Sequence, residues 1–264
     1  MKGKIKMNII VFDTETVGLQ KPFCYNLCYV IYETETEKIL ARKSFVISQV
    51  WYNLPLFNTA YYAEKRPLYV NALKGKKTKL IKWGFACREM AYDIEKFEVG
   101  AGFAYNSPFD IRVFDFNCDW YKNVNPIETL PIYDIRGYFH EIFCGEGSPF
   151  FDWCEKFNAF TDNGAYSTTA ENAYRFLSGR EDFNEAHTAL NDSEIELEIL
   201  RHCILEGAPI DGNFIARKTI ERKTSKNFQV FFNKKEVFST NYSKKFEKKD
   251  ENGSKIFLSD VAEM

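Results

Sequence analysis

The sequence predicts an α/β or α+β fold built on a mixed β-sheet. Its β-rich runs gather near the N-terminus and further strands then alternate with helical segments, an order typical of sheets with parallel and antiparallel strands. The 264 residues, 45% hydrophobic and 27% charged, can bury a core, which excludes wholesale disorder. The net charge of −2 excludes a uniformly basic nucleic-acid coat protein. No apolar run approaches the roughly 20 residues that a membrane-spanning helix needs, so we expect no membrane association.

The first half of the chain supplies most of the predicted sheet. Residues 8–12 form a short apolar run rich in β-branched side chains, which predicts a buried strand. Two more β-rich runs cover residues 24–32 and 39–47, and the polar stretch 33–38 between them predicts a hairpin. We expect residues 49–83, which contain many aromatic residues, to be irregular.

The second half alternates between helical and extended patterns. Apolar spacing of three and four residues predicts helices, and Pro108 suits the first turn of one of them. The elements expected in order are a helix over 86–97, a strand over 99–105, a helix from Ser107, a strand over 131–135, a helix from Thr168 to Leu177 and a helix over 189–205.

Charge divides the chain close to residue 212. Residues 217–264 hold 12 Lys and Arg against 7 Asp and Glu, a net charge of +5, whereas residues 1–216 carry a net charge of −7. We therefore expect a domain over residues 1–212 and a basic, aromatic-rich C-terminal extension over 213–264. Interleaved lysines and aromatic rings are typical of segments that hold single-stranded nucleic acid. The alternatives are a solvated segment that docks on the domain, or one that binds a protein partner.

The seven cysteines include no C-x-x-C pair, so a zinc site is not expected. We expect small buried or free thiols in a reducing compartment. The apolar stretch over residues 7–12 is too short for the core of a signal peptide. Together these features predict a cytoplasmic protein.

Two carboxylates, Asp13 and Glu15, stand at the end of the first strand. Residues two apart in a strand point to the same face, so these side chains project together. An isolated D-x-E is usually a solvated strand end. The apolar run before this pair favours the alternative, in which two neighbouring buried acids require a cation.

A third acid, Asp110, lies three residues after Ser107 at the start of a predicted helix. Ser107 can cap this helix and Asp110 can complete a capping box, which is a sufficient structural role. Asp192 has no such simple explanation, because it lies three residues before Ile195 on the inward stripe of the last helix. An inward carboxylate needs a cation, although a salt bridge or an N-terminal cap would also satisfy it. His187, five residues earlier, taken alone would be an ordinary surface or core histidine.

Taken together, these segments resemble the DEDDh 3′–5′ exonucleases of the DnaQ-like, ribonuclease H-like superfamily. The resemblance rests on FDTETVGL over residues 12–19, YNSPFD over residues 105–110 and HTALND over residues 187–192. They occur in the family's order and spread across most of residues 8–206. The resemblance implies a five-stranded mixed sheet flanked by helices, here with an insertion over about 49–83 and a C-terminal extension.

The resemblance also implies the roles of these residues. Two divalent ions, Mg²⁺ or Mn²⁺, would be held by Asp13, Glu15 and Asp192, with Asp110 reaching the second ion. His187, with an ordinary pKa of about 6.5, would be the general base. Carboxylate oxygens suit these hard cations independently of the resemblance. The residues that would contact the 3′-terminal nucleotide are Thr14, Thr16, Gly18, Leu19, Asn106 and Phe109.

The expected activity is hydrolysis of phosphodiester bonds from the free 3′ end of single-stranded nucleic acid, DNA ahead of RNA, releasing nucleoside 5′-monophosphates. One alternative is a catalytically idle nucleic-acid-binding or inhibitory module with the same fold. Another is a carboxylate-rich metal or sugar enzyme, which would not predict the spacing of His187 and Asp192. Leu19 and Phe109 could equally be core residues.

Overall fold

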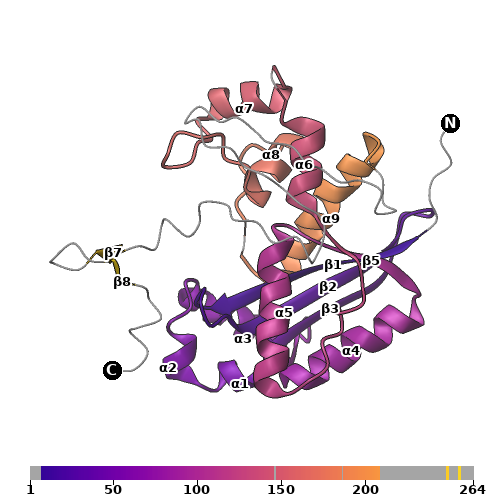
Figure 1. The fold of residues 1–264 in the computed structure, drawn as a ribbon, viewed down its shortest axis with the longest axis vertical. Helices are drawn as coiled ribbons and strands as arrows, with labels where there is room; N and C mark the ends of the chain where they lie inside the picture. The colour runs from indigo at the N-terminus through magenta and orange to yellow at the C-terminus, as the bar shows by residue number, and fades with distance from the viewer. Residues whose placement is uncertain (1–6, 146, 186, 209–247, 250–254, 257–264) are drawn as a thin grey trace.

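A six-stranded mixed sheet forms the centre of the molecule (Figure 1), which confirms the predicted α/β architecture. The computed structural model describes residues 7–145, 147–185, 187–208, 248–249 and 255–256. The strand order across the sheet is β4-β3-β2-β1-β5-β6, with β1 antiparallel to β2, β2 antiparallel to β3, and the other neighbours parallel. The strands are β1 (Asn8–Val17), β2 (Phe23–Glu33), β3 (Lys38–Ile47), β4 (Lys79–Ile81), β5 (Val99–Ala104) and β6 (Ile132–Asp134).

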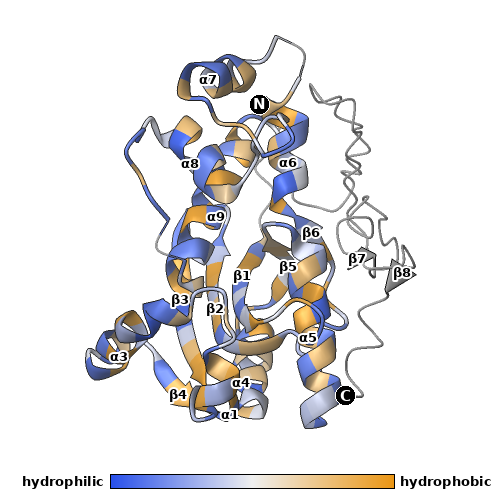
Figure 2. Ribbon diagram, turned by 90° about the vertical axis from the view of Figure 1, so that its left-hand side faces the viewer, coloured by the Kyte–Doolittle hydropathy of each residue, from blue (hydrophilic) through white to orange (hydrophobic). Residues whose placement is uncertain are grey.

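Helices cover both faces of the sheet (Figure 1). The even-numbered residues of β1, such as Ile10 and Phe12, pack with α4 (Trp83–Lys96) and α5 (Ser107–Tyr121). The odd-numbered Ile9 and Val11 face the other layer. That layer consists of α6 (Ile135–Phe143), α7 (Pro149–Phe157), α8 (Ala170–Ser178) and α9 (Ala189–Leu205). Apolar and hydrophilic colours alternate along these helices in Figure 2, as expected of amphipathic helices on a sheet.

The expectation that residues 49–83 are irregular is wrong. This stretch, called the inserted segment below, folds around the buried ring of Tyr25, which lies 5.1 Å from the ring of Phe57 and 5.7 Å from that of Tyr69. Its elements are too short for their periodicity to show in the sequence. They are α1 (Ser48–Trp51), α2 (Leu54–Phe57), the 3₁₀ helix η1 (Ala63–Lys65), α3 (Arg66–Lys74) and β4. Strand β4 is the addition that makes the sheet six-stranded rather than five-stranded.

The C-terminal extension expected over 213–264 lies outside the described residues, apart from an antiparallel pair of two-residue strands. These are β7 (Lys248–Lys249) and β8 (Lys255–Ile256). The role expected for the extension therefore stays a prediction. All seven cysteines lie in the described residues, where each is buried and free of a disulfide. Within the described part of the chain, the helices lack the combination of length and apolar character needed to cross a membrane.

Candidate active site

Asp13 and Glu15 lie on the part of β1 that extends past its parallel neighbour. The β1–β5 pairing ends at Val11 opposite Phe103, while the pairing of β1 with β2 continues to Val17. Strand alternation turns both carboxylates toward the face covered by α9, on which Val11 also lies. The two acids thus project together beyond the carboxyl end of β5, as the sequence predicted.

Helix α9 brings a third carboxylate to this place. Asn26 of β2 holds the start of the helix, because its Oδ1 accepts a hydrogen bond from the Ala189 backbone N–H at 3.1 Å. Asp192, one turn later, is 7% exposed, which confirms that it lies on the inward side of the helix. Its carboxylate can place a ligand atom within 4.8 Å of ligand atoms of Asp13 and Glu15. Two neighbouring acids of β1 and a third that is far along the chain therefore share one small volume.

Asp110 reaches the same region from the start of α5, but not as a helix cap. The N-cap position is occupied by Asn106 in the left-handed conformation (φ +64°), and Ser107 is the first helical residue. The capping box that the sequence allowed as an alternative role for Asp110 therefore does not form. The hydroxyl of Thr14 donates a hydrogen bond of 2.6 Å to Oδ1 of Asp110 and holds this carboxylate near the end of β1.

The electrostatics of the cluster are unfavourable when all its acids are ionised. Burial, followed by the charge of Glu185, raises the pKa of Asp13 to about 7. Burial, and then the charges of Asp13, Glu185 and Glu15, raise the pKa of Asp192 to about 11. The pKa values of Glu15 and Asp110 are also raised well above their usual range, first by burial and then by Asp13. The cluster thus disfavours its own negative charge.

These residues fit a divalent cation. Oδ1 of Asp192 is buried and has no hydrogen-bond partner among the described residues. A buried carboxylate oxygen left in this state is costly unless a cation takes the place of water. Carboxylate oxygens are the ligands that Mg²⁺ and Mn²⁺ prefer. A bound cation would also neutralise the mutual repulsion of Asp13, Glu15 and Asp192.

His187 lies in the coil that leads into α9, where a ring nitrogen is within 4.8 Å of carboxylate oxygens of Glu171 and Glu185. The charge of Glu185 in turn acts on Asp13 and Asp192 of the acid cluster. The backbone of His187 is left-handed (φ +49°), and its Nδ1 lies 3.4 Å from Oε2 of Glu185. Burial, followed by the positive charge of Lys65, lowers the pKa of His187. The imidazole is therefore biased toward its neutral form, which a proton acceptor requires.

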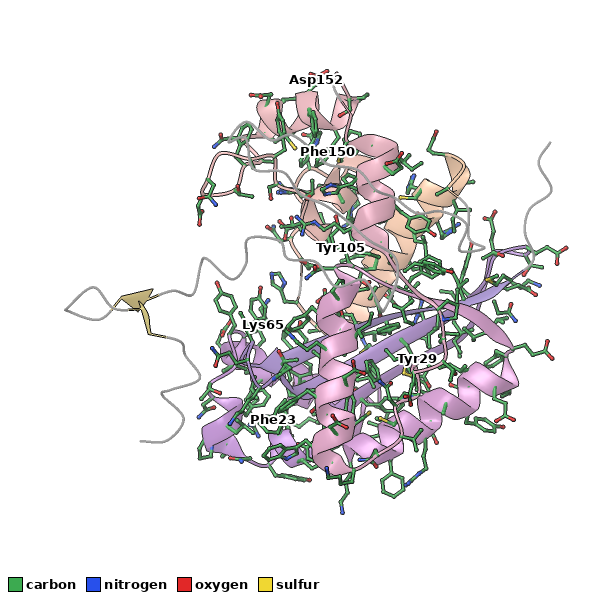
Figure 3. The ribbon with its side chains drawn as sticks, in the orientation of Figure 1. Phe23, Tyr29, Lys65, Tyr105, Phe150 and Asp152 are labelled. Atoms are coloured by element: carbon green, nitrogen blue, oxygen red, sulfur yellow. The ribbon has the colours of Figure 1, made fainter. Side chains whose placement is uncertain are left out.

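Sequence reasoning missed three charged residues at this site. Glu185 has a pKa of about 7, raised by burial and then by Glu171, and it followed no periodic pattern because it lies in coil. Lys65, labelled in Figure 3, comes from the inserted segment, and its charge acts on Glu15, Glu185 and Asp192. Nothing in the sequence around Lys65 indicates that it lies near these acids.

The third missed residue is Glu196, which is buried one turn after Asp192 on α9. It accepts a hydrogen bond of 3.2 Å from the backbone N–H of Tyr105, a residue labelled above the start of α5 in Figure 3. Burial, and then the charge of Asp13, raise its pKa well above the usual range. Helical periodicity could have found it, since residues four apart share a face.

The residues expected to contact a nucleotide differ in exposure and bonding. Leu19 is 54% exposed and so is not a core residue, whereas Phe109 is half-buried against the α4–α5 side of the core. Gly18 has a positive φ of +86° and open space where a Cβ would be. Thr14 is buried with its hydroxyl bonded to Asp110. The other two are the half-buried Thr16, bonded to the Gly18 carbonyl, and the exposed Asn106.

The sequence matches no protein-family model and no curated protein. Its structure is similar to that of the nuclease domain of 3′hExo, a DEDDh family member, bound to rAMP, with 13% identity over 76% of this chain and 94% of that chain, at a TM-score of 0.50. A structure of 3′-end-specific recognition of a histone mRNA stem-loop by a 3′-exonuclease matches at 11% identity over 86% of this chain and 77% of that chain, with a TM-score of 0.52. These likenesses confirm the expected ribonuclease H-like fold of the DEDDh exonucleases.

Proposed function

We propose that this protein is a divalent-metal-dependent 3′–5′ exonuclease that releases nucleoside 5′-monophosphates from single-stranded nucleic acid. One observation carries the proposal: the half-buried Asp13 and Glu15 of β1 and the buried Asp192 of α9 share one small volume, and Oδ1 of Asp192 has no hydrogen-bond partner among the described residues. Buried acids that repel one another destabilise a fold, so their convergence indicates a functional use. The fold shared with DEDDh exonucleases agrees with this use.

Asp13, Glu15 and Asp192 would hold the metal, and Asp110 would reach toward a second ion. When bound, such a pair of cations stabilises the charge that develops on the attacking and leaving oxygens of phosphoryl transfer. The hydroxyl of Tyr25 donates to Oε2 of Glu15 at 3.4 Å, and Thr14 donates to Asp110. In the proposed function these two donors would hold the carboxylates in place, as hydrogen-bond partners of metal ligands do.

His187 would accept the proton of the attacking water. Its Nδ1 faces Glu185, and an imidazole that carries its proton on Nδ1 leaves Nε2 as the acceptor. Glu185 would thus fix the tautomer and the orientation of the ring, as a carboxylate does for a catalytic histidine in hydrolases. The lowered pKa of His187 keeps Nε2 available near neutral pH.

The 3′-terminal nucleotide would lie between the exposed Leu19 and the half-buried Phe109. The open space at Gly18 allows a nucleic-acid strand to approach the protein backbone closely. The two similar structures contain rAMP or concern an mRNA stem-loop, so RNA is a substrate to test beside DNA, although the sequence favoured DNA. The 2′-hydroxyl is the group by which a protein distinguishes the two.

The test is incubation of the purified protein with 5′-labelled single-stranded DNA and RNA oligonucleotides, in Mg²⁺, in Mn²⁺ and in EDTA. Each oligonucleotide is supplied with a free 3′-hydroxyl and with a blocked 3′ end. The expected result is stepwise shortening of the free-ended strands, with release of nucleoside 5′-monophosphates only in the presence of metal. Asp192→Asn is the matched control, because it preserves shape and removes the charge.

Three outcomes would contradict the proposal. Undiminished cleavage in EDTA would show that the carboxylates do not act through a metal. Tight binding of the strands with no cleavage in either metal would favour the catalytically idle module. Internal cleavage of the strands with blocked 3′ ends would show that the protein is an endonuclease rather than an exonuclease.

A further inference from the structure

The inserted segment contacts His187 directly. The ring of Tyr62 lies parallel to the imidazole, with 4.4 Å between ring centroids and 12° between ring planes. Tyr62 is the N-cap residue of η1, and Nζ of Lys65, the last residue of η1, lies 4.4 Å from the centroid of the same tyrosine ring. A segment distant from the motif residues in sequence therefore covers one face of the imidazole.

The other close neighbours of the His187 ring nitrogens among the described residues are the carboxylates of Glu171 and Glu185. His187 lies in coil between α8 and α9, and its φ of +49° is in a region that non-glycine residues seldom occupy. The ion-pair distance of 3.4 Å to Glu185 constrains one edge of the ring. An edge contact of this kind permits rotation out of the plane, whereas a stacked neighbour fixes the plane itself.

Tyr62, in contrast, is attached to a well-packed platform. The ring of Tyr25 on β2 packs edge-on against Phe57, at 5.1 Å between centroids. Arg66, just after η1, lies with its guanidinium 4.0 Å from the ring centroid of Trp51 and donates to the Trp51 carbonyl at 3.3 Å. The turn that carries Tyr62 is thus anchored to the sheet on one side and to α1 on the other.

We propose that Tyr62 is a positioning residue that holds the imidazole of His187 in the orientation required for proton transfer. The proposal rests on the proposed function, in which His187 is the general base. Tyr62 itself touches neither the substrate nor the reacting atoms in this role. It acts by restricting the plane of the ring, and misplacement of a catalytic group by about 1 Å lowers rates by as much as about 10²-fold.

The experiment compares Tyr62→Leu, Tyr62→Phe and His187→Ala with the wild-type protein. Tyr62→Leu should lower kcat by about 10-fold to 10²-fold with little change in KM, because ring placement affects the chemical step rather than binding. Tyr62→Phe keeps the flat face and should restore kcat to near the wild-type value. Tyr52→Leu is the matched control, since Tyr52 lies in the same segment and is 72% exposed.

A second readout does not depend on activity. The chain has three histidines, so the ring signals of His187 can be identified in an NMR spectrum by their loss in His187→Ala. A stacked tyrosine shifts these signals upfield and gives cross-relaxation between the two rings in the wild-type protein. The upfield shift should persist in Tyr62→Phe and disappear in Tyr62→Leu.

The outcomes separate this inference from the proposed function. If His187→Ala leaves kcat unchanged, or the wild-type protein does not cleave, the proposed function fails. If His187→Ala is inactive while Tyr62→Leu retains wild-type kcat or changes KM alone, only the positioning role fails. Absence of cross-relaxation between the rings of Tyr62 and His187 in the wild-type protein would also overturn it, even if a variant did not fold.

Discussion

Two buried aspartates on opposite faces of the sheet have opposite surroundings. Asp93 on α4 is 3% exposed and accepts a hydrogen bond from the hydroxyl of Tyr29 at 2.8 Å (Tyr29 is labelled in Figure 3). Its carboxylate also pairs with Nζ of Lys43 at 2.7 Å. Asp192 is buried to a similar degree, yet its nearest charges are other acids and one of its oxygens has no partner in the described residues. Burial alone therefore does not distinguish the two aspartates, whereas their partners do.

The fold satisfies one of these carboxylates and not the other. At Asp93 it supplies the donor and the cation that burial requires. At Asp192 the described residues supply mainly further acids, and the charge of Lys65 is the smallest of the influences on its pKa, so a bound cation would be the favourable partner in the proposed function. Changing the two residues should therefore have opposite effects on stability and on activity.

The largest expected effect is at Asp192. Asp192→Asn should lower the rate of metal-dependent cleavage by at least about 10³-fold, because the metal contributes several kcal/mol to transition-state stabilisation. The same change should raise the melting temperature in EDTA, because burial and the neighbouring acids force the metal-free Asp192 to take up a proton on folding, and an amide of the same shape is neutral without that cost. Initial rates and thermal unfolding measure the two effects. An Asp192→Asn variant that is both active and less stable would show that Asp192, like Asp93, stabilises the fold and is not needed for cleavage.

The next effect is on pH dependence without metal. The pKa values of Asp13, about 7, and Asp192, about 11, lie above the value of an aspartate in the unfolded chain. Between the unfolded and the folded pKa of each group, the folded state therefore binds more protons than the unfolded state. The free energy of unfolding should therefore fall as pH rises from 5.5 to 8, by about 1 kcal/mol per pH unit for one such group. Chemical denaturation across this range measures the slope.

Two controls sharpen that result. Asp192→Asn should flatten the slope, whereas a change at Asp93 should leave it in place. Mn²⁺ should reverse the trend, because metal binding requires ionised carboxylates and stabilises the folded state more as pH rises. A free energy of unfolding that rises with pH in the metal-free wild-type protein would contradict the raised pKa values.

A smaller effect is expected from Asp93→Asn. An amide cannot balance the charge of Lys43, and hydrogen bonds to charged groups contribute about 1.5–3 kcal/mol, so the free energy of unfolding should fall by about this amount. Because Asp93 lies outside the carboxylate cluster, kcat should be unchanged. Urea denaturation and steady-state kinetics test both statements. Loss of activity in a stable, folded variant would show that the two aspartates are functionally coupled.

The smallest effect is expected at Glu196, which belongs fully to neither class. Like Asp93 it has a donor, the N–H of Tyr105, and like Asp192 it faces other acids. Glu196→Gln keeps a carbonyl oxygen as acceptor and removes the charge, so the free energy of unfolding should rise by less than about 1 kcal/mol. The value of kcat should change by less than about threefold. A loss as large as that in Asp192→Asn would place Glu196 among the metal-binding residues.

Periodicity explains which parts of this molecule could be predicted from sequence. Asp13 and Glu15 follow from the alternation of a strand, and Asp192 follows from the inward stripe of α9. These residues are placed by the element on which they lie. Helices α6 and α7 were missed because their aromatic residues are too dense to show one apolar face.

The rest of the site depends on tertiary packing. Glu185 and Tyr62 reach His187 from coil and from a short turn, where position in the chain does not fix the direction of a side chain. Local sequence left a capping role open for Asp110, because the hydroxyl that holds its carboxylate belongs to Thr14, 96 residues away. Contacts of this kind are set by the packing of distant segments and leave no local pattern.

The hydrogen bond from Ala189 to Asn26 also affects when the site can form. It joins residues separated by 163 positions, whereas β1, β2 and β3 pair with their immediate neighbours in sequence. Contacts across such separations form late, because a long loop must close first. A chain still being synthesised can therefore build the antiparallel strands with Asp13 and Glu15 but lacks the carboxylate of Asp192. The carboxylate cluster is completed only after α9 has been made and has docked, so an unfinished chain cannot present the full set of carboxylates.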